Sequence, residues 1–108
     1  MTDAVKELKD ALRDTYRRMK DDCGYPANRF LQMIDRRGPV ETAIELVMSP
    51  KPSRGFVTLQ TYRRLDLAVE AIVLRDEFSH LFGDEVKAAA RRRLTEHGYD
   101  PQSTPRND

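Results

Sequence analysis

The sequence is poor in several features that particular classes of protein require. It has one cysteine, Cys23, among 108 residues, which excludes an internal disulfide framework and a thiolate-cluster metal site. Basic and acidic side chains number 19 and 18, and the net charge of +1 provides no overall attraction to nucleic acid or to an acidic membrane. No apolar run approaches the roughly 18 residues of a membrane span, and no signal-peptide-like stretch lies near the start. We therefore expect a single-domain protein of the cytoplasm that has no membrane partner.

Motifs for catalysis are also missing. The chain has no glycine-rich phosphate loop, no nucleophile elbow and no dinucleotide fingerprint. Its two histidines, His80 and His97, lie far from other suitable ligands, so we expect no metal and no cofactor. Cys23 follows two aspartates at the end of a predicted helix, where negative potential raises a thiol pKa. Glu85 and Lys87 match half of a nuclease metal motif but would point about 200° apart on a helix. These observations favour a protein that is not an enzyme.

Apolar residues recur at helical spacing along most of the chain. Residues 3–22 form the clearest amphipathic pattern, ended by Gly24 as a left-handed stop. Further helices are predicted over residues 26–37, 39–48, 56–65, 65–74 and 84–97, with Asp84 as the N-cap of the last, and a helical turn over 78–82. The fold class is thus all-α: a single compact bundle of five or six short helices over residues 1–99. A polar, proline-containing tail over 100–108 is expected to be disordered.

Residues 65–74 are compatible with two kinds of secondary structure. Almost all are apolar, and three of them are β-branched, which leaves a strand open as an alternative. A buried helix is favoured, because no second strand-like segment exists to pair with a lone strand. Glu70 lies within this run, so we expect it to be partly buried and to need a cationic partner. Arg63, Arg64 and Arg75 are the candidates, and a structural ion pair is favoured over contact with a ligand.

Positive charge is concentrated in the middle of the chain. Residues 25–64 contain seven basic and three acidic side chains, and residues 38–64 can be read as helix, loop, helix. Arginine, glutamine and threonine suit phosphate and base-edge contacts, although the loop is longer than the turn of a DNA-binding helix-turn-helix. A solvated helix face explains the same side chains without a ligand. The predicted surface for nucleic acid or an acidic partner consists of Arg36, Arg37, Lys51, Arg54, Thr58, Gln60, Arg63 and Arg64.

Two other hypotheses remain open. The apolar face of the first helix could enter the groove of a partner or of a second copy of the chain. This face consists of Leu8, Leu12, Tyr16 and Met19. The other hypothesis is a cryptic enzyme that uses Glu70, His80 or Tyr62. It requires two of these side chains to share one pocket with Arg64.

Several segments resemble a small, uncharacterised bacterial helical domain that occurs alone and as an appendage to larger proteins. They are residues 24–33 (GYPANRFLQM), 37–43 (RGPVETA), 64–71 (RLDLAVEA), and 93–94 with 98–99. The resemblance covers roughly residues 15 to 99 and implies an adaptor rather than a self-sufficient enzyme; no catalytic residue is carried over from it. We therefore predict a non-catalytic helical binding module that contacts nucleic acid through its basic middle segment. The alternative is an adaptor for protein interaction or homo-oligomerisation.

Overall fold

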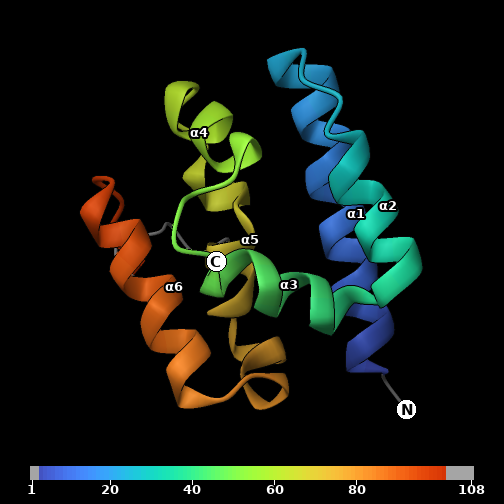
Figure 1. Cartoon of the computed structure of the whole chain (residues 1–108), viewed down its shortest axis with the longest axis vertical. Helices are drawn as coiled ribbons and strands as arrows, with labels where there is room; N and C mark the ends of the chain where they lie inside the picture. The colour runs from blue at the N-terminus through green and yellow to red at the C-terminus, as the bar shows by residue number, and fades with distance from the viewer. Residues whose placement is uncertain (1–2, 102–108) are drawn as a thin grey trace.

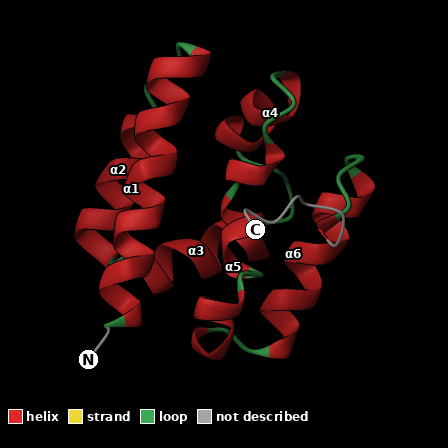
Figure 2. Ribbon diagram, turned by 180° about the vertical axis from the view of Figure 1, so that it is seen from behind, coloured by secondary structure: helices red, strands yellow, loops and turns green. Residues whose placement is uncertain are grey.

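Helices account for all the regular secondary structure in the computed structural model, which describes residues 3–101 (Figures 1 and 2). The predicted all-α class is confirmed. Within this range there are six α-helices and two short 3-10 helices, against the five or six helices predicted. They are α1 (Ala4–Cys23), α2 (Asn28–Arg37), α3 (Pro39–Met48), α4 (Arg54–Thr61), η1 (Leu65–Leu67), α5 (Val69–Val73), η2 (Asp76–Leu81) and α6 (Asp84–Glu96). Most of the predicted tail, residues 102–108, lies outside the described residues.

Local signals set the ends of α1. The Asp3 carboxylate accepts hydrogen bonds from the backbone N–H groups of Val5 and Lys6, at 3.1 and 3.3 Å, and so caps the first turn. Gly24 ends the helix with a φ of +65°, a conformation that glycine adopts without a Cβ clash. The chain then turns back through residues 25–27 into α2, and α1 and α2 lie side by side (Figures 1 and 2).

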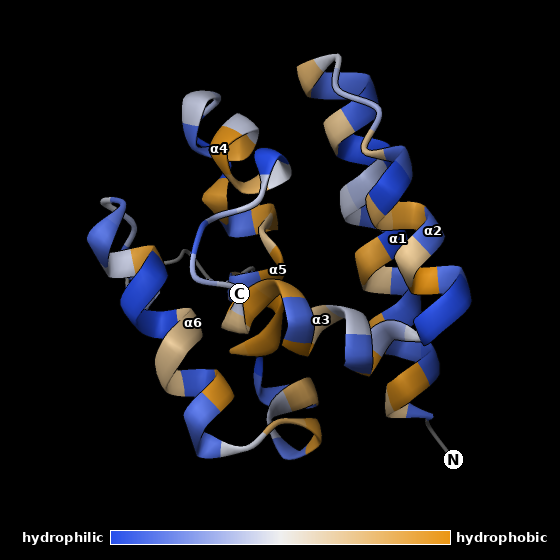
Figure 3. Ribbon diagram, in the orientation of Figure 1, coloured by the Kyte–Doolittle hydropathy of each residue, from blue (hydrophilic) through white to orange (hydrophobic). Residues whose placement is uncertain are grey.

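α3 links this pair of helices to the rest of the molecule. Gly38, with φ +87° and ψ 163°, makes the corner between α2 and α3, and Pro39 occupies the first turn of α3, where its missing N–H is not needed. From there α3 runs toward α5 and α6, while α4 lies above them (Figure 1). Apolar residues are dense on α3 and α5 in the middle of the molecule, whereas α1, α2 and α6 alternate between apolar and polar (Figure 3). The apolar core therefore continues through α3 from the α1–α2 pair to α5 and α6.

The run over residues 65–74 is neither one helix nor a strand. It divides into η1 and α5 at Ala68, which has extended backbone angles of φ −66° and ψ 152°. In a continuous helix the Leu67 carbonyl would accept a hydrogen bond from the N–H of Ala71. Here that N–H donates to the Ala68 carbonyl, while the Leu67 carbonyl accepts from the buried Thr15 hydroxyl of α1 at 2.8 Å. A tertiary hydrogen bond thus takes the acceptor that helix continuation would need.

Boundaries of α4 and α6 also differ from the prediction. α4 covers Arg54–Thr61 rather than 56–65, because the Ser53 hydroxyl caps its start by accepting from the N–H of Phe56 at 3.1 Å. Asp84 is not the N-cap of α6: it lies in the first turn, and Gly83 precedes the helix without a side-chain cap. A carboxylate in the first turn still stabilises the positive end of the helix dipole.

Candidate functional site

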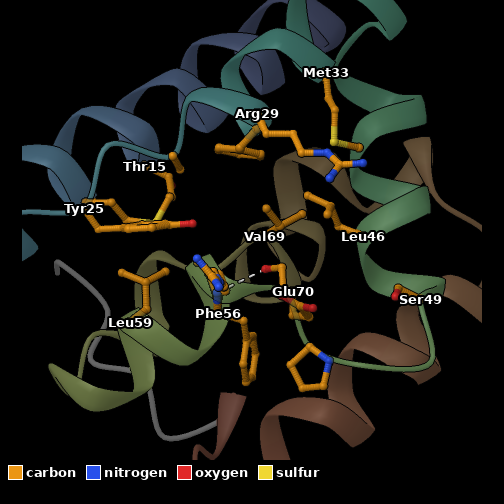
Figure 4. A pocket seen from close by; sticks show the side chains of 18 of the residues that line it. Thr15, Tyr25, Arg29, Met33, Leu46, Ser49, Phe56, Leu59, Val69 and Glu70 are labelled. Carbon is orange, nitrogen blue, oxygen red and sulfur yellow. Dashed lines mark hydrogen bonds between the residues drawn. The ribbon is translucent and has the colours of Figure 1, made fainter.

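A cleft of about 550 Å³ lies where the α1–α2 pair faces α4, with residues of α3 and α5 completing its lining (Figure 4). Tyr25 and Arg29 come from the α1–α2 side, and Phe56 and Leu59 come from α4. The volume falls within the range of roughly 300–1,000 Å³ that is usual for small-molecule sites. The cleft is therefore large enough to hold an organic ligand.

The lining of the cleft is mainly apolar and aromatic. Its principal apolar members are Met19, Phe30, Phe56, Leu59 and Val69. Tyr25 lies among them, half-buried, with its hydroxyl pointing into the cleft (Figure 4), and this hydroxyl makes no hydrogen bond to any described residue. An apolar cavity with a few polar groups is the usual composition of a ligand site.

The charges of the lining are unequal. Its two carboxylates are each paired with an arginine that does not line the cleft: Glu45 with Arg37 and Glu70 with Arg93. The three cations of the lining are exposed and form no ion pair within residues 3–101; they are Arg29, Lys51 and Arg54. Because the carboxylates are already neutralised, the cleft presents three uncompensated positive charges to a ligand.

The Glu70–Arg93 pair is the most deeply buried ionic contact of the described chain. Glu70 is 3% exposed, and Nη1 of Arg93 donates to its Oε2 at 3.1 Å. Arg93 also donates to the carbonyl of Leu46, at 3.0 Å, and to that of Ser49. One guanidinium thus joins α6 to α5 and to the C-terminal end of α3. Burial raises the pKa of Glu70 above its ordinary value, against the opposing effects of its own backbone N–H, Arg93 and His97.

The predicted partner of Glu70 was therefore wrong. None of Arg63, Arg64 and Arg75 pairs with it; Arg64 instead bonds Asp66 at 3.1 Å. The expected structural ion pair does exist, but its cation comes from α6. No local sequence pattern indicates this partner, because the pair forms only when α6 packs against α5.

The eight residues of the predicted basic surface are divided by the fold. Lys51 and Arg54 line the cleft, and Arg29, which was not assigned to that surface, joins them. Arg36 and Arg37 lie in the last turn of α2, where the chain turns into α3 and away from α4 (Figure 1). The remaining four lie on or directly after α4: Thr58 and Gln60, both half-buried, exposed Arg63, and half-buried Arg64. The set thus does not gather around this cleft.

Several of these side chains already have partners. Arg37 is paired with Glu45 and Arg64 with Asp66. The Gln60 amide donates to the carbonyl of His97 at 3.3 Å. Lys51 and Arg54 are the members whose charge and position suit a ligand in the cleft.

The predicted partner face of the first helix belongs to the chain's own core. Leu8 and Leu12 are 0% exposed and Met19 is 3% exposed. Tyr16 is half-buried, and its hydroxyl bonds Oδ1 of Asn28 in α2 at 3.1 Å. A helical apolar stripe looks the same in sequence whether it packs internally or against a partner. Using this face for a partner would require the bundle to open.

The geometry required for the cryptic enzyme is not found in this cleft. Glu70 lines it, but His80, Tyr62 and Arg64 do not. His97 ends α6, and its ring packs edge-on against Phe56 with centroids 5.0 Å apart. Burial and the neighbouring Asp22 raise the pKa of the Cys23 thiol, as predicted in direction. Among residues 3–101, no three His, Cys, Asp or Glu side chains are grouped so that they could hold a metal ion. The helices of the same range lack the length or the hydrophobicity that a membrane span requires.

No family model, curated protein or solved structure matches the chain. The resemblance to a bacterial helical domain accordingly stays a prediction. The class defined by fold and site is an all-helical protein with an apolar, positively charged cleft.

Proposed function

We propose that this protein is a non-catalytic binding module whose cleft holds a small amphipathic anion, a molecule with an apolar body and a negatively charged group. The observation that carries the proposal is the combination of apolar walls with three uncompensated cations, Arg29, Lys51 and Arg54, in one cavity. The apolar body would displace water from the half-buried side chains of Tyr25, Met33 and Leu46. Burial of apolar area stabilises such a complex by about 25 cal/mol per Å² before the costs of association.

The cations supply the selectivity for charge. Arginine and lysine bind carboxylate or phosphate oxygens through charge-assisted hydrogen bonds. The pairing of Glu45 and Glu70 with arginines outside the cleft removes the repulsion that free carboxylates would exert on an anion. Because the three cations are exposed, salt should weaken binding, with a screening length of about 8 Å at physiological ionic strength.

The two functions predicted from sequence have less support. A nucleic acid gains most of its affinity from a series of phosphate contacts, and only Lys51 and Arg54 of the eight predicted residues line the cleft. For the adaptor, Leu8, Leu12 and Met19 are already buried within the fold. The nucleic-acid function is nevertheless a distinguishable outcome of the experiment below.

Titration with indole-3-propionate, which joins a flat apolar body to a carboxylate, tests the proposal. We expect amide resonances of Tyr25, Arg29 and residues 51–56 to shift in two-dimensional NMR. The triple variant Arg29→Gln, Lys51→Gln, Arg54→Gln should bind at least about tenfold more weakly. The matched control loses three exposed cations outside the cleft, through Lys6→Gln, Lys20→Gln and Arg75→Gln, and should bind like the parent protein.

Three results would overturn the proposal. The first is no shift at millimolar ligand. The second is an equal loss of affinity in both triple variants, which would indicate unspecific attraction to charge. The third is tight binding of single- or double-stranded DNA at low salt by a protein that does not bind indole-3-propionate, which would favour the nucleic-acid function instead.

A further inference from the structure

The most deeply buried charged side chain that lines the cleft is Glu70. It lines the cleft together with apolar neighbours such as Val69 and Phe56 (Figure 4), yet only 5% of its side chain is accessible. Arg29, Lys51 and Arg54, by contrast, are exposed. A ligand that spans the cleft would therefore meet the cations at its outer end and a hydrogen-bond acceptor at its inner end.

Glu70 retains capacity to accept a hydrogen bond from a ligand. An ionised carboxylate offers about four acceptor positions. Arg93 uses one of them through Oε2, and the backbone N–H of Glu70 itself also contributes a bond. These two bonds leave about two of the four acceptor positions unused.

Apolar contact alone would be unfavourable at this point. A ligand that fills the cleft removes the last water from Glu70, and a polar group that loses water without gaining a hydrogen bond is penalised. Arg93 neutralises the charge, so a neutral donor such as N–H or O–H suits the position better than a second cation.

We propose that Glu70 determines the specificity of the cleft by accepting a hydrogen bond from an N–H or O–H group at the apolar end of an anionic ligand. The ligand class is an amphipathic anion with a neutral donor at the end opposite its charge. This inference rests on the proposed function, because it requires a ligand in the cleft. It adds Glu70 as a residue that selects among anionic ligands by a hydrogen bond, whereas the three cations attract any anion by charge.

A pair of nearly isosteric probes separates the two claims. Indole-3-propionate carries a ring N–H that only donates, and 1-benzothiophene-3-propionate has sulfur in its place. The parent protein should bind the indole compound about 10- to 100-fold more tightly, the range expected for a hydrogen bond to a charged group. Glu70→Gln should lose this preference, because a glutamine amide held through its oxygen by Arg93 would turn an NH₂ donor toward the ring N–H.

The double variant Glu70→Met, Arg93→Met provides a second readout that leaves no unpaired charge in the core. It should bind both probes with similar affinity. Tyr25→Phe removes the hydroxyl that points into the cleft and should keep the preference for the indole compound.

The outcomes distinguish the inference from the function on which it rests. If neither probe binds the parent protein, the proposed function fails. If both probes bind the parent protein equally, the cleft binds anions but Glu70 does not accept a hydrogen bond from the ligand. The inference about Glu70 then fails, while the proposed function stands. Loss of the preference in Tyr25→Phe together with its survival in the double variant would assign recognition to Tyr25 and would likewise refute the role of Glu70.

Discussion

Replacement of Arg93 by methionine should destabilise the fold more than the same replacement of its partner, Glu70. The two side chains form one ion pair, but they are not equivalent. Arg93 donates to Glu70 and to the carbonyls of Leu46 and Ser49, whereas Glu70 accepts only one side-chain bond. Arg93→Met therefore leaves a buried carboxylate and two carbonyl oxygens without their partner.

The expected losses in the free energy of unfolding follow from these contacts. Removing one partner of a buried pair costs about 3–5 kcal/mol, and we place Arg93→Met in that range. In Glu70→Met the guanidinium keeps both carbonyl acceptors, and its side chain is 11% accessible, so the loss should be about 1.5–3 kcal/mol, the contribution of one hydrogen bond to a charged group. The double variant should be more stable than Arg93→Met, because it no longer buries an unpaired carboxylate.

Urea unfolding followed by circular dichroism at pH 7 measures these differences. For a domain of this size each kcal/mol also corresponds to roughly 4–8 °C in Tm, so thermal melts provide an independent check. Equal losses in the two single variants would refute the reasoning, as would a larger loss for Glu70→Met. If the double variant loses the sum of the two single losses in free energy of unfolding, Glu70 and Arg93 do not interact.

Three further predictions concern single positions. The buried hydroxyl of Thr42 has no hydrogen-bond partner among the described residues, so Thr42→Val should raise the free energy of unfolding by about 1 kcal/mol in urea titrations; Thr15→Val, which removes the 2.8 Å bond to a backbone carbonyl, should lower it by a similar amount. Gly38 has φ +87° and ψ 163°, a region that almost only glycine adopts, so Gly38→Ala should lower the free energy of unfolding by about 1–3 kcal/mol. The control is Gly83→Ala, which should leave the free energy of unfolding unchanged, because Gly83 has φ −75° and no atom lies near the added Cβ. Equal effects of the two substitutions would contradict the strain argument. Burial raises the pKa of Glu70 above its ordinary 4.5, so the folded chain binds the proton of this carboxyl more tightly than the unfolded chain does. The contribution of Glu70 to stability therefore falls as pH rises from about 4.5 through the raised pKa. Unfolding midpoints measured between pH 4 and 7 should show this fall in the parent protein, and Glu70→Gln should lack it.

The ends of α1 and the start of α3 were among the most predictable parts of the fold. Residues 3–22 were expected to be helical, and α1 covers Ala4–Cys23, because Asp3 and Gly24 act within one turn of the helix ends. α3 begins at Pro39, as predicted, since proline is favoured in a first turn regardless of the surroundings. Such signals need no tertiary contact and can be read from a few consecutive residues.

The break at Ala68 shows where local reasoning fails. The composition of residues 65–74 predicts burial, and the segment is largely buried. Its backbone path, however, depends on the Thr15 hydroxyl of α1, which bonds the Leu67 carbonyl across 52 positions of sequence. Periodicity within the segment contains no information about a bond of this kind.

The candidate site depended on tertiary structure to a still greater extent. The positive charge of residues 25–64 and the need of Glu70 for a cation are properties of the sequence, since they follow from residue types and their neighbours. The selection of Arg29, Lys51 and Arg54 as the cations of the cleft, and of Arg93 as the partner of Glu70, was decided only when α2, α4 and α6 took their places. Helical spacing determines which residues share a face of a helix, but the packing of one helix against another determines which residues that face contacts.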